Sequence, residues 1–209
     1  MKISPSVWTS DLMVAGDPAV DFVNTLSQAE TDPIDRLGGP EALAEWTEVA
    51  GLASAKAASR MKEDIRQDPA AAAAIYGEAS AFRSALQRIF AAAAKGRAAG
   101  PADLRQIDDW LRRGASSTVI RARAGAYERA FSPDAAELEK PLIEIARAAE
   151  HLLLEGHLGR LHECAGEGCG WMFVDTSKNG RRRWCSMATC GTSAKVKKFR
   201  SRKKTKPAD

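Results

Sequence analysis

The chain has 209 residues, 44% hydrophobic and 28% charged, which is enough for a hydrophobic core without disulfide bonds and excludes a fibre or a disulfide-stapled miniprotein. It contains no apolar run of about 18 residues, which excludes a membrane-spanning helix. The net charge of +4 is unevenly divided along the chain. Residues 160–209 hold 13 Lys and Arg against 4 Asp and Glu, whereas residues 1–159 hold 18 Lys and Arg against 23 Asp and Glu. The basic C-terminal part is therefore suited to bind a polyanion.

Proline residues mark the beginnings of the first predicted helices. Asp17-Pro18 is typical of a capped helix start with proline in the first turn, and Gly39-Pro40 begins a second segment in the same way. Asp68-Pro69 begins the longest one, in which apolar residues recur every three or four positions until Lys95-Gly96. Three helices are therefore predicted in this part of the chain.

The period of the sequence changes after the next helix. Pro101 begins that helix, and Gly114 is expected to close it. Residues 116–131 alternate with a period of two, and Ala124-Gly125 is a turn signal, so this segment predicts a β-hairpin. A last helix is predicted over residues 134–156.

The chain is therefore expected to hold two domains. Residues 1–158 form a mainly α domain with one small β-hairpin, and residues 159–206 form a zinc-ribbon-like finger made of a β-hairpin and a basic helix. No nucleophile and base pair, phosphate-binding loop or metal-spaced histidine pair occurs in residues 1–159, so we expect a protein that is not an enzyme. The helical domain is expected to sense a small-molecule effector or to form a homodimer.

Four cysteines lie within 27 residues as two pairs of equal spacing, Cys164-x4-Cys169 and Cys185-x4-Cys190. No secretory signal precedes them, so we expect a cytoplasmic protein, in which clustered cysteines are metal ligands or reactive thiols rather than disulfides. Four thiolates suit one structural Zn²⁺ ion. An iron–sulfur cluster is the alternative with a metal, and four buried thiols or two redox pairs are the alternatives without one.

The segment between the two pairs predicts a β-hairpin. Residues 171–175 alternate as a strand, and Asn179-Gly180 is a turn signal leading into a second strand that ends at Cys185. His162 is expected to be a neighbour of the metal rather than a ligand. The aromatic residues of the segment are expected to pack around the metal or, as the alternative, to stack on nucleobases; they are Trp171, Phe173 and Trp184.

A basic helix is predicted after the second pair, capped by Thr192 or Ser193. Its large apolar residues, Val196 and Phe199, share one side and are expected to dock on the zinc site. Folding around the metal would join this helix to the preceding arginines as one surface for phosphates; a solvated cationic tail is the alternative. The candidate nucleic-acid-binding residues are Arg181, Arg182, Arg183, Lys195, Lys197, Lys198, Arg200, Arg202, Lys203 and Lys204.

These residues resemble the CGNR zinc finger of bacterial stress-induced transcription regulators. The likeness rests on Cys-x4-Cys-x-Trp-x-Phe-Val-Asp-x-Ser-Lys-Asn from Cys164, on Arg-Arg-Trp-Cys-Ser-Met from Arg182, and on Cys-Gly from Cys190. The segment Ala-Val-Asp-Phe-Val-Asn-Thr at 19–25 similarly resembles the Leu-Asp-Phe-Val-Asn-Thr opening of the ABATE domain that precedes this finger. The resemblance implies zinc ligation by all four cysteines and DNA binding by the finger.

Two positions need separate attention. Asp21 and Asn24 fall in the ABATE-like motif and share a helix face, where they line a small-ligand pocket or cap and pack the helix. Thr192-Ser193 stands where the family has Asn-Arg, and serine cannot replace the charge of arginine. If the family arginine pairs with an acid inside the protein, a carboxylate left without its partner should lie near Ser193.

Three functions remain open from the sequence. The first is a zinc-dependent transcription regulator that binds duplex DNA through the finger. The second is an RNA-binding or ribosome-associated zinc protein. The third is a thiol redox switch in which an oxidant ejects zinc.

Overall fold

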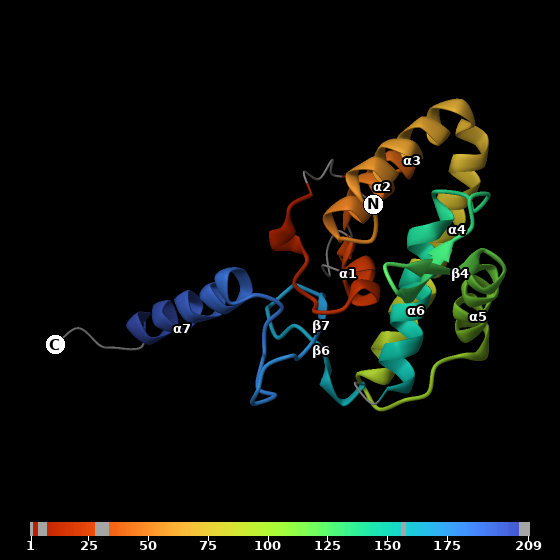
Figure 1. Cartoon of the computed structure of the whole chain (residues 1–209). Helices are drawn as coiled ribbons and strands as arrows, with labels where there is room; N and C mark the ends of the chain where they lie inside the picture. Colours follow the sequence, from red (N-terminus) through yellow and green to blue (C-terminus); the bar gives the residue numbers. More distant parts are fainter. Residues whose placement is uncertain (1, 4–7, 28–33, 156–157, 205–209) are drawn as a thin grey trace.

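The computed structural model describes residues 2–3, 8–27, 34–155 and 158–204. The described part is mainly helical with short strand pairs, as the sequence predicts (Figure 1). The elements are β1 (Lys2–Ile3), a 3-10 turn (Ser10–Leu12), α1 (Pro18–Asn24), β2 (Leu26–Ser27), β3 (Ile34–Asp35), α2 (Pro40–Val49), α3 (Ala55–Gln67), α4 (Pro69–Ala93), α5 (Pro101–Ser116), β4 (Thr118–Arg123), β5 (Ala126–Phe131), α6 (Glu139–Leu154), a 3-10 turn (Leu158–Arg160), β6 (Leu161–Glu163), β7 (Met172–Val174), a π-helical turn (Met187–Gly191) and α7 (Thr192–Lys204).

The predicted proline starts are confirmed in α1, α2 and α4. The Asp17 carboxylate accepts hydrogen bonds from the backbone N–H groups of Ala19 and Val20, and Asp68 accepts one from Ala71. These bonds satisfy donors that have no partner within the helix. Helix α3 was not among the predicted segments, and it is capped by the Ser54 hydroxyl.

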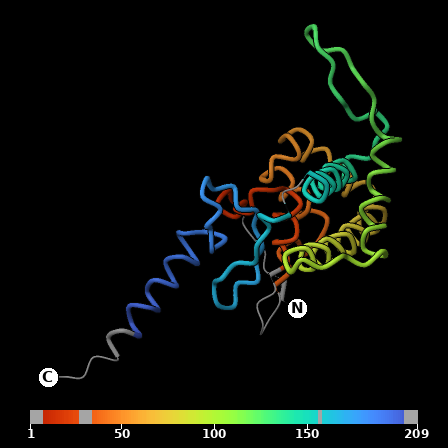
Figure 2. Tube along the Cα trace, turned by 90° about the horizontal axis from the view of Figure 1, so that it is seen from below, coloured from red at the N-terminus to blue at the C-terminus, as the bar shows by residue number. Residues whose placement is uncertain are grey.

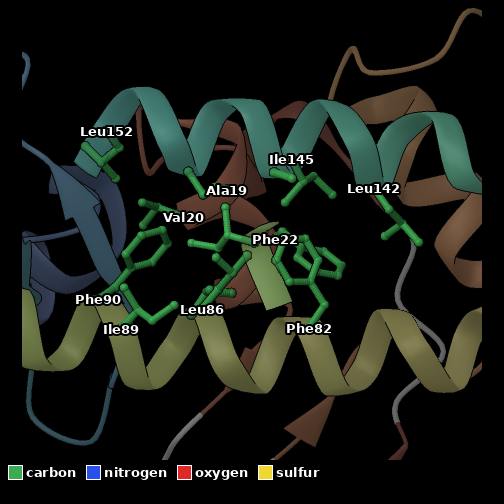
Figure 3. Close-up of a cluster of buried hydrophobic side chains, with 14 of the residues drawn as sticks. Ala19, Val20, Phe22, Phe82, Leu86, Ile89, Phe90, Leu142, Ile145 and Leu152 are labelled. Carbon is green, nitrogen blue, oxygen red and sulfur yellow. The ribbon is translucent and has the colours of Figure 1, made fainter. Parts of the chain in front are cut away.

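The hydrophobic core lies between α4 and α6, with α1 inserted between them (Figure 3). Phe22 of α1 packs between the two long helices, its ring centroid 5.3 Å from that of Trp46 and 6.3 Å from that of Phe82. Met172 and Val174 of β7 belong to the same core. The predicted finger and the helical domain therefore share one hydrophobic core.

Gly114 does not close its helix as predicted, because α5 continues to Ser116. A side chain at Gly114 would place its Cβ 2.6 Å from Ile143 of α6. The glycine is therefore explained by the close approach of α5 and α6 rather than by a helix end.

The predicted β-hairpin is confirmed by β4 and β5, whose antiparallel register pairs Thr118 with Phe131 and Arg123 with Ala126. Ala124 and Gly125 both have positive φ angles, 45° and 82°. A two-residue hairpin turn of type I′ requires positive φ at both positions, and its geometry matches the right-handed twist of the flanking strands. The hairpin projects from the helical body (Figure 2).

A small sheet of order β1-β3-β2 is tied to the core by a buried ion pair. The Arg83 guanidinium of α4 donates two hydrogen bonds to the Asp35 carboxylate, at 2.9 and 2.6 Å, and a third to the Thr25 hydroxyl. Burial opposes ionisation of Asp35, but the bonds from Arg83 lower its pKa below the ordinary value.

The finger begins with the antiparallel pair β6–β7, which joins Leu161 to Val174 and Glu163 to Met172. The second strand predicted before Cys185 is wrong, because residues 181–185 form no strand and β7 pairs with the segment that precedes the first cysteine. Helix α7 leaves the finger and extends away from the rest of the protein (Figures 1 and 2). Among the described helices, none combines the length and apolar character needed to cross a membrane.

Candidate metal centre and basic surface

The fold brings the four predicted cysteines together. Cys164 and Cys169 belong to a turn after β6, in which the Cys164 N–H donates to the Trp171 carbonyl at 2.8 Å. Cys190 lies in the π-helical turn directly before α7. The four Sγ atoms all lie within 4.8 Å of one another.

The geometry of the sulfur atoms fits one zinc ion. A Zn–S bond of about 2.3 Å in a regular tetrahedron places sulfur atoms roughly 3.8 Å apart. The Cys169 and Cys185 sulfurs are 3.6 Å apart, and those of Cys185 and Cys190 are 3.7 Å apart. These separations are far longer than a disulfide bond and match the edges of such a tetrahedron. His162, as predicted, is not part of the cluster.

The backbone around the site also suits a thiolate cluster. The N–H groups of Gly166 and Cys185 point at the Cys164 sulfur, at 3.3 and 3.2 Å. A Cβ at Gly166 would lie 2.9 Å from the Cys190 sulfur, so only glycine lets the first turn come this close to the second pair. The donor set and its surroundings are therefore those of a closed structural site.

The thiols cannot all ionise without a cation. Hydrogen bonding with the Cys185 thiol lowers the pKa of Cys169 to about 5, whereas burial raises the pKa of Cys190 to about 11. Four thiolates at these separations repel one another strongly. A bound Zn²⁺ removes this repulsion, so its binding stabilises the fold of the segment that carries the ligands.

The loop between β7 and Cys185 is organised by a buried carboxylate. Asp175 accepts hydrogen bonds from the backbone N–H groups of Ser177, at 2.9 Å, and Arg182, at 2.8 Å. The Ser177 side chain and these two N–H groups lower the pKa of Asp175 to about 2. Because Asp175 binds the Arg182 N–H, the chain here forms a loop in place of the predicted strand.

Arg182 was predicted to bind nucleic acid, but its guanidinium is engaged inside the protein. It donates to the carbonyls of Trp184, at 3.0 Å, of Val14, at 2.6 Å, and of Cys185. It also lies 4.4 Å above the centre of the Phe173 ring. Arg182 therefore joins the metal-binding loop to the helical domain, and we omit it from the proposed nucleic-acid surface.

Asp21 and Asn24 are buried at the junction of the two domains. The Asn24 side-chain amide donates to the Met172 carbonyl at 2.8 Å, and its oxygen accepts the Met172 N–H at 2.9 Å. Asp21 accepts the N–H of Ala15, and burial raises its pKa to about 7. Of the two alternatives from the sequence, the structure favours packing: these side chains hold β7 and the segment before α1 in place.

Apart from Arg160, which bonds the Asp175 carbonyl, the exposed basic residues described in the finger form two groups. One group surrounds a cleft of about 520 Å³ and consists of Lys178, Arg181 and Arg183. Trp184 lines the same cleft, with the Arg183 guanidinium 5.3 Å from its ring centre. Trp171, by contrast, faces Arg36 of the helical domain at 5.8 Å. Among the predicted stacking residues, Trp184 is therefore the one set in a basic cleft.

The second group lies on α7 and consists of Lys195, Lys197, Lys198 and Arg200, all exposed. Arg202, Lys203 and Lys204 belong to the last turn of the same helix. The prediction that Val196 and Phe199 dock on the zinc site is wrong, because they are 43% and 62% exposed. The helix extends away from the metal instead of folding back over it (Figure 1).

The start of α7 differs from the prediction as well. Thr192 is already helical, and its hydroxyl donates to the Met187 carbonyl instead of capping the helix. Ser193 lines a groove together with Glu167 and Lys197, which form an ion pair. The Glu167 carboxylate is therefore not the unpartnered group that was expected near Ser193, because it is paired with Lys197, one helical turn further along.

Four cysteine sulfurs at tetrahedral separations define a zinc-binding protein. Comparison with family models agrees with this assignment: residues 160–203 match the CGNR zinc finger, and residues 16–156 match the model named ABATE, "Putative stress-induced transcription regulator". The second match covers more than half of the chain, which therefore belongs to the ABATE family. Comparison with curated proteins gives no match.

Proposed function

We propose that the chain is a cytoplasmic transcription regulator that binds duplex DNA through its zinc finger. In this proposal the helical domain senses a small molecule or forms a homodimer, and the chain acts by binding rather than by catalysis. The observation that carries the proposal is the position of α7, a cationic helix that starts at the metal site and extends into solvent. The family name supports the regulatory role.

A free-standing helix of this composition would be stabilised by a polyanion. Helices of fewer than about 12–15 residues are marginal in water, and like charges three or four positions apart destabilise them further. Helix α7 has 13 residues and places Lys195, Lys198 and Arg200 on its exposed surface. At about 1.5 Å per residue it is roughly 20 Å long, and an α-helix of this diameter fits the major groove of B-DNA.

The zinc ion supports this role indirectly. When bound, it fixes the π-helical turn that holds Cys190 and so sets the direction in which α7 leaves the finger. Arg181 and Arg183 on the preceding loop add charge near the same metal site. Lys197 is paired with Glu167 and is therefore less available for phosphate than its neighbours.

The experiment is a titration of zinc-loaded full-length protein against labelled duplex DNA at several salt concentrations, followed by fluorescence anisotropy. About six neutralised phosphates give a slope of log K against log salt near −5. Replacing Lys195, Lys198 and Arg200 by Gln should make this slope shallower by about 2.5 to 3. A wild-type slope shallower than about −2 would contradict the proposal.

A matched control keeps the net charge change and moves it to the helical domain. Lys56, Arg105 and Arg129 are exposed and lie outside the finger. Replacing these three by Gln should leave the slope within about 1 of wild type, because a contact contributes only where it meets a phosphate. An equal loss in both triple variants would show that net charge, rather than α7, determines binding.

RNA binding is the second candidate, and the cleft around Trp184 favours it. Arginine and an indole ring in a basic cleft can hold an unpaired base by stacking. Competition between duplex DNA and a structured RNA at equal salt separates the two candidates. If RNA competes better and Trp184→Ala removes that advantage, the finger is an RNA-binding module.

A further inference from the structure

An apolar groove of about 750 Å³ lies where the helical domain meets the finger. Its walls come from the end of α4, the connection to α5, the end of α6, and the first residues of the finger at Leu158 and Leu161. Alanine and leucine side chains make up most of this lining. The volume falls within the range of about 300–1,000 Å³ that is usual for small-molecule sites.

The polar side chains of the groove offer one cation and hydrogen-bond donors. Among the described residues that line it, the side chains with nitrogen or oxygen atoms are Arg97 and His162. None of the lining residues that the structure describes carries a carboxylate, and the nearby Glu163 is paired with Lys95. A ligand that buries an apolar body here therefore meets the Arg97 guanidinium and the His162 ring at its polar end, and these hydrogen-bond donors suit a carboxylate.

We propose that this groove binds an amphipathic monocarboxylic acid. The apolar part of the ligand lies on the alanine and leucine walls, and its carboxylate accepts hydrogen bonds from Arg97 and His162. A second copy of the chain suits the groove less well, because a two-fold contact brings the same patch of each copy together. The positive Arg97 of each copy would then face a patch that carries the same positive side chain.

The position of the groove links the ligand to the metal site. Leu161 and His162 belong to β6, which pairs with β7 and ends one residue before Cys164. A ligand that fixes β6 also fixes the start of the first metal-binding turn. The regulatory part of this inference rests on the proposed DNA binding, whereas the binding site itself does not.

The test uses decanoate as the probe, titrated calorimetrically into zinc-loaded full-length protein below the micelle concentration. Decan-1-ol and decylammonium have the same chain with a neutral and a cationic head group. We expect one decanoate per chain, with decan-1-ol binding about tenfold more weakly and decylammonium more weakly still. Equal affinity for the three compounds would overturn the assignment of a carboxylate.

Two variants locate the site. A Cβ at Gly159 meets no atom within 4 Å, and its φ is not positive, so Gly159→Phe should fold and fill the groove. It should abolish decanoate binding, while Gly77→Phe, at an open position of α4 outside the groove, should not. Arg97→Ala should weaken binding about tenfold, and Arg105→Ala should leave it unchanged.

Three results would overturn the proposal: no heat of binding with decanoate at two well-separated temperatures, unchanged binding by Gly159→Phe, or a dimer in light scattering that Leu154→Asp dissociates. The DNA titration is then repeated with decanoate at saturation. A change in DNA affinity of fivefold or more supports regulation of DNA binding by the ligand. No change rejects that regulation but leaves the binding site itself supported. If the protein binds no DNA, the calorimetric result still decides the site.

Discussion

Asn24 offers a direct test of how the two domains are joined. Its amide makes two hydrogen bonds to the backbone of Met172, and both residues are nearly inaccessible, at 4% and 3% exposure. Asn24→Ala leaves the N–H and C=O of Met172 without these partners. Each unsatisfied buried group costs about 1–3 kcal/mol, and a water molecule entering the vacated space offsets part of this, so we expect a loss of about 3 kcal/mol.

The measurement is urea unfolding of zinc-loaded protein, followed by circular dichroism. Asn24→Asp keeps an acceptor for the Met172 N–H but places a carboxylate oxygen against the Met172 carbonyl, so it should destabilise to a similar extent. Asn179→Ala is the matched control, because Asn179 is exposed in the loop before Arg181. It should change the free energy of unfolding by less than about 0.5 kcal/mol.

Hydrogen exchange gives a second and local measurement. In the wild type, the Met172 amide is bonded to Asn24 and should exchange slowly. In Asn24→Ala it should exchange faster, with the largest increase in β7. A loss of stability below about 1 kcal/mol, together with unchanged exchange at Met172, would refute the view that this amide joins the domains.

Three further outcomes follow from the structure. Because burial raises the pKa of Asp21 to about 7, the folded state holds the Asp21 proton more tightly than the unfolded state, and the free energy of unfolding should fall by about 1.3 kcal/mol from pH 6 to pH 8. Asp21→Asn should lack this part of the pH dependence. Identical profiles of unfolding free energy against pH for the two proteins would contradict the prediction. Gly166→Ala should lower zinc affinity at least tenfold in competition with a chelator, because the new Cβ meets the Cys190 sulfur, whereas Gly159→Ala should not. Removing zinc should lower the melting temperature of the helical domain, because β7 completes the core of that domain. Calorimetry with and without a chelator measures this shift, and an unchanged melting temperature would show that the two domains are independent.

The sequence predicted those features that depend on neighbouring residues. Proline after aspartate or glycine begins α1, α2 and α4 because the signal and the structure lie within a few positions. Ala124-Gly125 likewise specifies the hairpin turn through local φ angles. The cysteine spacing predicted the metal site because the ligand set itself limits the geometry.

The sequence could not predict which segments pair across long distances. The alternation at 171–175 predicted a strand, but not its contacts with distant residues: Asn24, 148 residues earlier, binds the Met172 backbone, and the Ala15 carbonyl accepts the Val174 N–H. Arg182 lies in a run of three arginines and looks like its neighbours in the sequence. Its inward position depends on the Val14 carbonyl and the Phe173 ring, which only the fold brings close.

The shared strand also constrains how this protein can transmit a signal. Met172 and Val174 are part of the helical core, and Cys169 precedes the same strand by three residues. Leu161 of β6 belongs to the same core, so the finger cannot swing on a flexible linker without removing three side chains from it, at a cost of about 1.5–3 kcal/mol for each. If the helical domain binds an effector, as proposed, that effector would act by shifting β6, β7 and the first metal-binding turn together. The direction of α7 is thus set jointly by zinc and by the packing of the helical domain.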